Sequence, residues 1–286
     1  MKKSGAIAIL AHWRTGSNLL RDTLAACGMK EYIKELGIGH GDINGIGNSL
    51  CNGFPIDGDP IEIVSNALIH FKKVAESKEW KHYGVKVDHT LQSACWNEVG
   101  KQFESHWPDA RYVISIRHPA GIIRSIEKLR KTVKLEPDFT VQEIIESYLS
   151  TYEATKYLIE KKDALVVVYA NSYIDGSIKK VINELGLRWT KAAGELFDAT
   201  TLDDCSAPLF FISDEEHKYL KAVEMFEELK EYAVKPSDKK NTSSFGDWDV
   251  NYKRTCWTQA FTIKIIMNMA RNPGRAVTRT IAGFQS

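Results

Sequence analysis

A short polar turn after the first apolar run of the chain gathers groups that bind anions. Residues 6–11 have the pattern of a buried strand, and a helical periodicity starts at Ser17. A turn between a strand and a helix points backbone N–H groups and the positive end of the helix at one place. Side-chain donors in or beside the turn are Arg14, Thr15, Ser17 and Asn18. The turn also contains Gly16, and the whole segment predicts a phosphate-binding loop.

This loop lacks the spacing found in loops that bind nucleoside triphosphates with magnesium. Ala11 stands at the position of the first glycine of that motif, and Ser17 stands at the position of its lysine. We therefore expect an anion other than a magnesium nucleoside triphosphate, and we expect no metal site.

A second junction of the same kind follows the apolar run 111–116, where Arg117, His118 and Pro119 precede a helical periodicity. Proline suits the first turn of a helix, because its missing N–H is not needed there. Ser125 then lies about two turns into the helix, where it and Arg117 can converge on one phosphate. The alternative is an arginine paired with a carboxylate and a serine on a solvated helix face.

Together, the two segments resemble the sulfotransferase family. Its members carry a loop of the form Lys/Arg-Ser/Thr-Gly-Ser/Thr-Ser/Thr, which binds the 5′-phosphosulfate of the donor 3′-phosphoadenosine 5′-phosphosulfate (PAPS). They also carry a strand that ends R-x-P, with a serine eight residues after the arginine, and this pair binds the 3′-phosphate. Residues 14–18 fit the first pattern with Asn18 in place of Ser/Thr, and Arg117 and Ser125 fit the second. The resemblance implies that PAPS contacts Arg14, Thr15, Gly16, Ser17, Asn18, Arg117 and Ser125.

The resemblance also implies a base that takes a proton from the acceptor. His89 is similar to the strand-end histidine of the family segment T-H-L-P, although Asp88 precedes it and Thr90 follows it. His12 and Asp88 are the alternative bases, and either can instead orient His89. A structural, hydrogen-bonded histidine is a further alternative. Lys86 is either a cation of the cleft or a lysine whose stem packs along the strand.

Other positions carry weaker likenesses to the family. Arg14 stands where many members have a lysine, and arginine keeps its proton, so we expect it to stabilise charge on the leaving group. Tyr169 resembles a strand-end tyrosine that meets the adenine base. Residues 246–248 resemble the family's G-D-W segment, but the preceding R-K-G triplet is absent. Either Lys239 and Lys240 supply the positive charge of the absent triplet, or they are solvated lysines.

Composition agrees with an enzyme-sized domain. The chain has 286 residues, of which 43% are hydrophobic and 26% charged, and its formal net charge is +1. This balance indicates no polyanionic partner, so we expect no nucleic-acid binding. The cysteines form no C-x-x-C pair and indicate reduced thiols in a cytoplasmic protein. No run approaches the roughly 20 apolar residues of a membrane span.

Strand and helix patterns alternate along the chain. This order predicts an α/β fold with a central parallel β-sheet flanked by helices on both faces. The predicted strands are 6–11, 83–88, 111–116 and 164–169. The predicted helices are 17–27, 60–77, 92–104, 119–132, 140–161, 175–185, 214–232 and 256–271. We predict one domain over 1–286, with a glycine-rich lid or substrate loop at 28–60 and a helical C-terminal segment at 250–286.

With the resemblance, these patterns predict a sulfotransferase of P-loop-kinase-like fold. It would move a sulfuryl group in line from PAPS to a hydroxyl or amine, and it would release 3′,5′-adenosine bisphosphate. The acceptor is a small molecule, sugar, lipid or peptide. One alternative is a P-loop nucleotide kinase, which needs a loop lysine and a magnesium-binding acid. Another is an inactive nucleotide-binding relative, suggested by Asn18 and the absent R-K-G.

Overall fold

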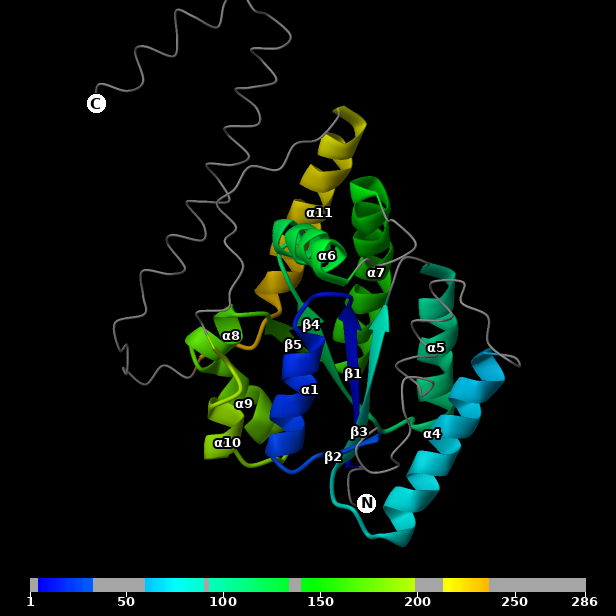
Figure 1. The fold of residues 1–286 in the computed structure, drawn as a ribbon. Helices are drawn as coiled ribbons and strands as arrows, with labels where there is room; N and C mark the ends of the chain where they lie inside the picture. The colour runs from blue at the N-terminus through cyan, green and yellow to red at the C-terminus, as the bar shows by residue number, and fades with distance from the viewer. Residues whose placement is uncertain (1–4, 33–59, 90–92, 134–139, 199–212, 237–286) are drawn as a thin grey trace, which may run out of the picture.

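A parallel five-stranded sheet forms the centre of the protein (Figure 1), in the strand order β2-β3-β1-β4-β5. The computed structural model describes residues 5–32, 60–89, 93–133, 140–198 and 213–236. The strands are β1 (Ala6–His12), β2 (Lys30–Glu31), β3 (Tyr83–His89), β4 (Arg111–Ile116) and β5 (Leu165–Val168). All of the pairs between neighbouring strands are parallel, so their carboxyl ends meet at one edge of the sheet.

Helices cover both faces of this sheet, as the sequence predicts. The long helices are α1 (Ser17–Ala26), α4 (Pro60–Ser77), α5 (Ser93–His106), α6 (Pro119–Val133), α7 (Val141–Lys162) and α11 (Ser213–Glu231). Three shorter ones are α8 (Asn171–Ile174), α9 (Ser177–Glu184) and α10 (Lys191–Gly194). The predicted strands and long helices are confirmed to within a few residues, whereas β2, α8 and α10 are additional. The predicted helix 256–271 lies outside the described residues.

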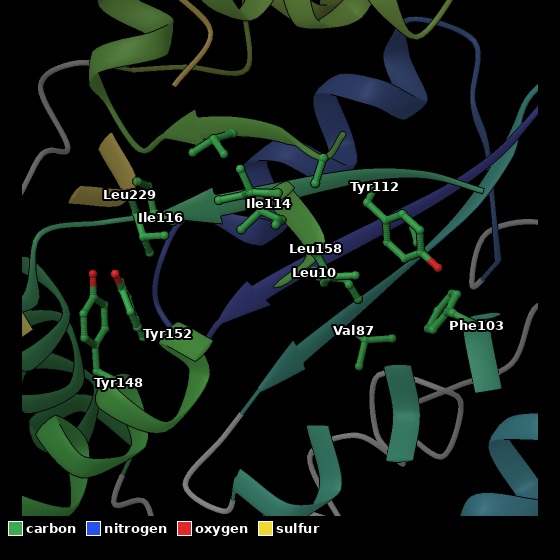
Figure 2. Close-up of a cluster of buried hydrophobic side chains, with 14 of the residues drawn as sticks. Leu10, Val87, Phe103, Tyr112, Ile114, Ile116, Tyr148, Tyr152, Leu158 and Leu229 are labelled. Carbon is green, nitrogen blue, oxygen red and sulfur yellow. The ribbon is translucent and has the colours of Figure 1, made fainter. Parts of the chain in front are cut away.

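Alternate strand residues belong to two different hydrophobic clusters. Ala6, Ala8 and Leu10 of β1 pack on the face covered by α4, α5, α7 and α11, part of which Figure 2 shows. Ile7 and Ile9 pack on the opposite face, against α1 and α9. Successive residues of β1 point to opposite faces of the sheet, and both faces are buried. The sequence of β1 is therefore an unbroken apolar run.

The segment predicted as a lid at 28–60 is described only at its start. Gly28 has a φ of 108° and follows the end of α1, where glycine adopts the left-handed conformation without strain. Lys30 and Glu31 then pair with the start of β3. Residues 33–59 and the predicted C-terminal segment 250–286 lie outside the described residues.

None of the helices in the described ranges is long and apolar enough to cross a membrane.

Candidate donor-binding site

The predicted phosphate loop lies between β1 and α1 and has a left-handed backbone at two positions. Arg14 has a φ of 65° and Gly16, the residue before α1, has a φ of 82°. For a residue with a Cβ this conformation costs on the order of 1–3 kcal/mol and is held only when its surroundings fix it. Thr15 supplies that support, because its hydroxyl donates to the His12 carbonyl at 2.7 Å and its own carbonyl accepts from Ser115 Oγ at 2.7 Å.

The structure brings both predicted phosphate-binding motifs together. Arg14 Nε donates to Ser125 Oγ at 2.9 Å, and Arg117 Nη1 donates to the Arg14 carbonyl oxygen at 3.1 Å. Arg117 is 8% exposed and Ser125 is 3% exposed, so neither is a residue of a solvated face. Two guanidinium groups and a serine hydroxyl thus meet at the carboxyl edge of the sheet, which is an arrangement that suits a phosphate.

Tyr169, the residue just after β5, packs against Arg117 and against the loop. The Arg117 Cζ atom lies 4.7 Å from the centre of the Tyr169 ring, in cation–π geometry. The same ring lies against Gly16, where a Cβ atom would come within 1.9 Å of Tyr169 Cδ2. Gly16 is therefore required both by its backbone conformation and by the close approach of the ring. Ala170 follows with a φ of 68°, a second strained position at this edge.

His118 caps the helix that carries Ser125. Its Nδ1 accepts from the Ala120 backbone N–H at 3.2 Å, in the first turn of α6. Burial and, to a smaller extent, the positive charges of Lys230, Arg124 and Arg117 together lower the pKa of His118 to about 4. The unprotonated ring is the form that can accept this bond, so the cap depends on a neutral His118.

His12, an alternative base, is 7% exposed and has partners at both ring nitrogens. Nδ1 donates to the Trp13 carbonyl at 2.8 Å, so in the neutral ring Nε2 accepts from Ser147 Oγ at 3.0 Å. The ring also packs edge-on against Tyr148 and lines a small cavity of about 20 Å³. His12 can therefore take up a proton only at Nε2, which faces α7.

The other two candidate bases lie at the end of the neighbouring strand. Asp88 pairs with Ala11 and His89 pairs with His12 in the parallel register of β1 and β3. The backbone of His89 is thus at the same edge as the loop. The side chains of both residues lie outside the described part of the structure, and their roles stay predictions.

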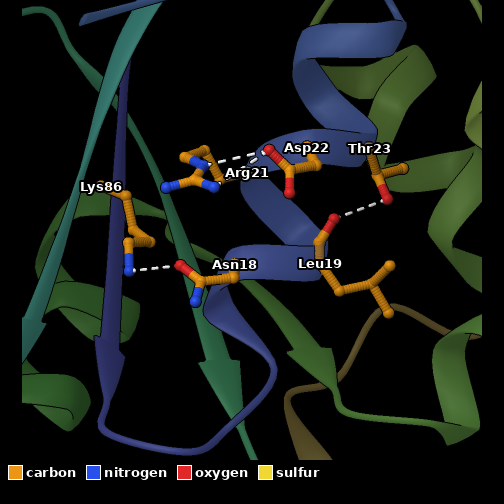
Figure 3. A network of polar contacts seen from close by, with 6 residues as sticks. All are labelled: Asn18, Leu19, Arg21, Asp22, Thr23 and Lys86. Atoms are coloured by element: carbon orange, nitrogen blue, oxygen red, sulfur yellow. Dashed lines mark hydrogen bonds and ion pairs between the residues drawn. The ribbon is translucent and has the colours of Figure 1, made fainter. Parts of the chain in front are cut away.

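Lys86 and Asn18 form a link between β3 and α1 (Figure 3). Lys86 Nζ donates to Asn18 Oδ1 at 2.8 Å, and the lysine side chain is 4% exposed. The contact with the start of α1 agrees with a cation of the cleft, and the buried stem agrees with a lysine packed along the strand, so both interpretations of Lys86 stay predictions. Asn18 replaces the Ser/Thr of the sulfotransferase pattern, and this lysine is its partner.

Several contacts of the site have no motif in the sequence. Ser115 bonds to the loop, Ser147 to His12 at the end of β1, and His118 to the backbone of α6. These partners are distant in sequence or on the backbone. Ser115 is a polar residue in an apolar run whose positions 112–116 are all buried, which is the one signal that its hydroxyl needs a partner. Residues 239, 240 and 246–248 lie outside the described residues.

Comparison with known proteins gives a likeness of fold. No family model and no curated protein matches the chain. The sulfotransferase domain of the olefin synthase of Synechococcus PCC 7002 superimposes with a TM-score of 0.50 at 15% identity, over 79% of this chain and 96% of that one.

Two further structures are more loosely similar. The sulfotransferase domain of the curacin biosynthetic pathway has a TM-score of 0.46 at 14% identity, over 85% of this chain and 96% of that one. The tunicamycin resistance protein of Deinococcus radiodurans has a TM-score of 0.42 at 14% identity, over 65% of this chain and 98% of that one. The chain has an α/β fold similar to that of a sulfotransferase domain.

Proposed function

We propose that this protein is a sulfotransferase that uses PAPS as donor and a hydroxyl or amine as acceptor. The observation that carries the proposal is the convergence of Arg14, Arg117 and Ser125 at the carboxyl edge of the sheet. In open parallel α/β sheets, ligands bind at this edge. The fold similar to a sulfotransferase domain supports the same conclusion.

The donor carries two phosphate groups on one ribose, so residues that bind them have to lie close together, as Arg14 and Ser125 do. In the proposal, the loop amides and Arg14 hold the 5′-phosphosulfate, and Arg117 with Ser125 holds the 3′-phosphate. Tyr169, which already packs on Arg117 and Gly16, would meet the adenine. No carboxylate cluster is needed, because cations and backbone N–H groups neutralise the donor.

The reaction needs a base on one side of the sulfur and charge stabilisation on the other. His89 would accept the proton of the acceptor while the acceptor atom forms its bond to sulfur. As the bond from sulfur to the 5′-phosphate oxygen breaks, Arg14 and the loop amides would stabilise the negative charge left on the phosphate. A preorganised donor of this kind is typically worth roughly 2.7–4 kcal/mol in the barrier.

Calorimetry with two nucleotides tests the donor. We expect 3′,5′-adenosine bisphosphate to bind to the protein, and ATP with magnesium to bind much more weakly, because the loop lacks the triphosphate spacing. Tighter binding of ATP with magnesium would favour a P-loop nucleotide kinase instead.

An assay with labelled PAPS then tests the reaction. We expect transfer of label to an acceptor from a panel of phenols, sugars, lipids and peptides. Binding of the bisphosphate without any transfer or release of sulfate would identify an inactive nucleotide-binding relative. The panel also gives the acceptor class, which the described residues do not define.

A further inference from the structure

Ser115 is a polar residue inside the sheet, and its hydroxyl is bonded to the loop. It lies in β4 between Ile114 and Ile116, and it is 3% exposed. Its Oγ donates to the Thr15 carbonyl oxygen at 2.7 Å. Thr15 is itself completely buried, and a buried carbonyl costs free energy unless it accepts a hydrogen bond. The two residues therefore satisfy each other across the boundary between the sheet and the loop.

The direction of this carbonyl decides the direction of the backbone N–H that follows it. In a planar trans peptide, the C=O and the next N–H point in opposite directions. Ser115 draws the Thr15 carbonyl toward β4, so the Gly16 N–H is turned away from β4. Because α1 begins at Ser17, this N–H belongs to the positive end of a helix, where backbone N–H groups bind anions.

The carbonyls that precede Thr15 in the loop also accept hydrogen bonds from side chains. The donors are Thr15 Oγ1 to His12 at 2.7 Å, His12 Nδ1 to Trp13 at 2.8 Å, and Arg117 Nη1 to Arg14 at 3.1 Å. Four successive peptides are thus fixed, which explains how the loop keeps a left-handed backbone at Arg14 and Gly16. Of the four side-chain donors, Ser115 is the one that comes from within a neighbouring strand of the sheet.

We propose that Ser115 is a positioning residue of the donor site, whose hydroxyl holds the Thr15 carbonyl and thereby directs the Gly16 N–H at the bound anion. The inference rests on the proposed function in taking that anion to be the 5′-phosphosulfate of the donor. Ser115 itself does not touch the donor in this proposal. Removing its hydroxyl weakens anion binding by releasing one peptide group, and no charge is lost.

NMR spectroscopy of the wild type gives the first test, because Thr15-Gly16 is the single Thr-Gly pair in the sequence. In protein labelled with ¹³C at threonine carbonyls and ¹⁵N in glycine, a carbonyl-to-amide correlation selects this peptide alone. The probe is inorganic pyrophosphate, which has two tetrahedral groups joined through oxygen, as phosphosulfate has. We expect the Gly16 amide proton to shift downfield on titration. An unmoved signal at saturation would overturn the proposal even if no variant folds.

Two variants of nearly equal shape isolate the hydroxyl. Ser115→Thr keeps it, and Ser115→Val replaces it with a methyl group. Ser115 lines a cavity of about 20 Å³, which gives both variants room for the added methyl group. By calorimetry, we expect Ser115→Val to bind pyrophosphate and 3′,5′-adenosine bisphosphate about tenfold or more weakly, since a backbone N–H to a charged group is lost. Ser115→Thr should bind both like the wild type, and it should keep the shift of the Gly16 amide, which Ser115→Val should lose.

Thr190→Val is the matched control for a purely structural effect. Thr190 Oγ1 donates to the Ala26 carbonyl at 3.1 Å at the far end of α1, and it accepts from the Ala193 N–H at 3.1 Å. This variant also loses a hydroxyl bonded to the backbone, so it should lower the melting temperature and leave both affinities unchanged. A lower melting temperature with unchanged affinities in Ser115→Val would make Ser115 a structural residue, and the proposal would be wrong.

The two probes distinguish failure of this inference from failure of the proposed function. If the wild type binds pyrophosphate but not the bisphosphate, and Ser115→Val weakens pyrophosphate binding, the PAPS assignment fails and the role of Ser115 stands. If the wild type binds both probes and Ser115→Val binds them equally well, the role of Ser115 fails and the donor assignment stands. If the wild type binds neither probe, both fail.

Discussion

The two edges of the sheet are built on opposite principles. At the amino edge, the ring of Phe71 packs against four aromatic neighbours, which are Tyr32, Trp80, Tyr83 and Trp107. At the carboxyl edge, the cations Lys86 and Arg117 are buried. A left-handed backbone does not distinguish the edges, because Glu79 and Asp163 adopt it ahead of β3 and β5, as Arg14 and Ala170 do after β1 and β5. Among the described residues, the amino edge is filled by aromatic packing, whereas the carboxyl edge holds buried cations. Buried charge of this kind is expected where a protein binds or transforms a ligand.

The largest expected effect is a loss of turnover when the proposed base at the carboxyl edge is removed. If His89 takes the acceptor proton, His89→Ala should lower turnover by about 10²–10⁴-fold with donor affinity near that of the wild type. The turnover of the wild type should also fall on the acid side of the ordinary histidine pKa of about 6.5, and the variant should lack this fall.

Steady-state assays across pH, with calorimetry of the bisphosphate, check this expectation. Retained turnover in His89→Ala would move the role to His12 or Asp88. Loss of donor binding would instead make His89 a structural residue or a phosphate ligand.

A large change at the amino edge should lower the stability of the protein and leave ligand binding unchanged. Phe71 is completely buried in its aromatic cluster, so Phe71→Ala should lower the free energy of unfolding by about 3–5 kcal/mol. Urea melts followed by tryptophan fluorescence measure this loss. Bisphosphate affinity, measured in the folded range, should stay within error of the wild type. A parallel loss of affinity would show that the two edges are coupled and would break the contrast.

A pH-dependent stability is expected from the histidine that caps α6. The folded-state pKa of His118 is lowered from 6.5 to about 4 by burial and by nearby cations. Between these values the unfolded chain binds more protons, so the free energy of unfolding should fall as pH falls from about 6.5 to about 4. The full loss from this group is about 3 kcal/mol, and above pH about 6.5 its contribution is constant.

His118→Asn isolates this contribution. Asparagine keeps an acceptor for the Ala120 N–H but does not titrate, so the variant should lose less stability than the wild type over the same pH range. Denaturant melts at several pH values measure both slopes. Equal slopes would mean that other groups carry the acid sensitivity of the protein.

Sequence patterns predicted the sheet well because its strands are buried on both faces. Unbroken apolar runs such as 165–168 have few other interpretations, and helices of α7's length show their periodicity clearly. The four-residue helices α8 and α10 and the two-residue strand β2 are too short to show any period. They form because of tertiary packing, which a local pattern does not contain.

The site was predictable in its residue types but not in its pairings. Motif spacing predicted that Arg14 and the R-x-P segment act on one ligand. Hydrogen bonds join Arg14 to Ser125 and to Arg117, and the shared ligand stays a prediction. The Lys86–Asn18 bond joins residues 68 apart in sequence. No local rule pairs positions so far apart, because the folded sheet alone brings β3 beside the start of α1.

The smallest of these effects compares the two arginines that flank β4. Arg117→Ala should weaken bisphosphate binding by at least about tenfold, because a charge-assisted phosphate contact is worth about 1.5–3 kcal/mol. Arg111 is the matched control, since it lies at the amino end of the same strand and donates to the Glu184 carbonyl at 3.0 Å. Arg111→Ala removes the same charge and should leave the affinity unchanged. Calorimetry on both variants, with circular dichroism to verify the fold, gives the comparison. Equal affinities in the two variants would show that positive charge at the carboxyl edge does not bind the 3′-phosphate, and the contrast between the edges would then be one of packing alone.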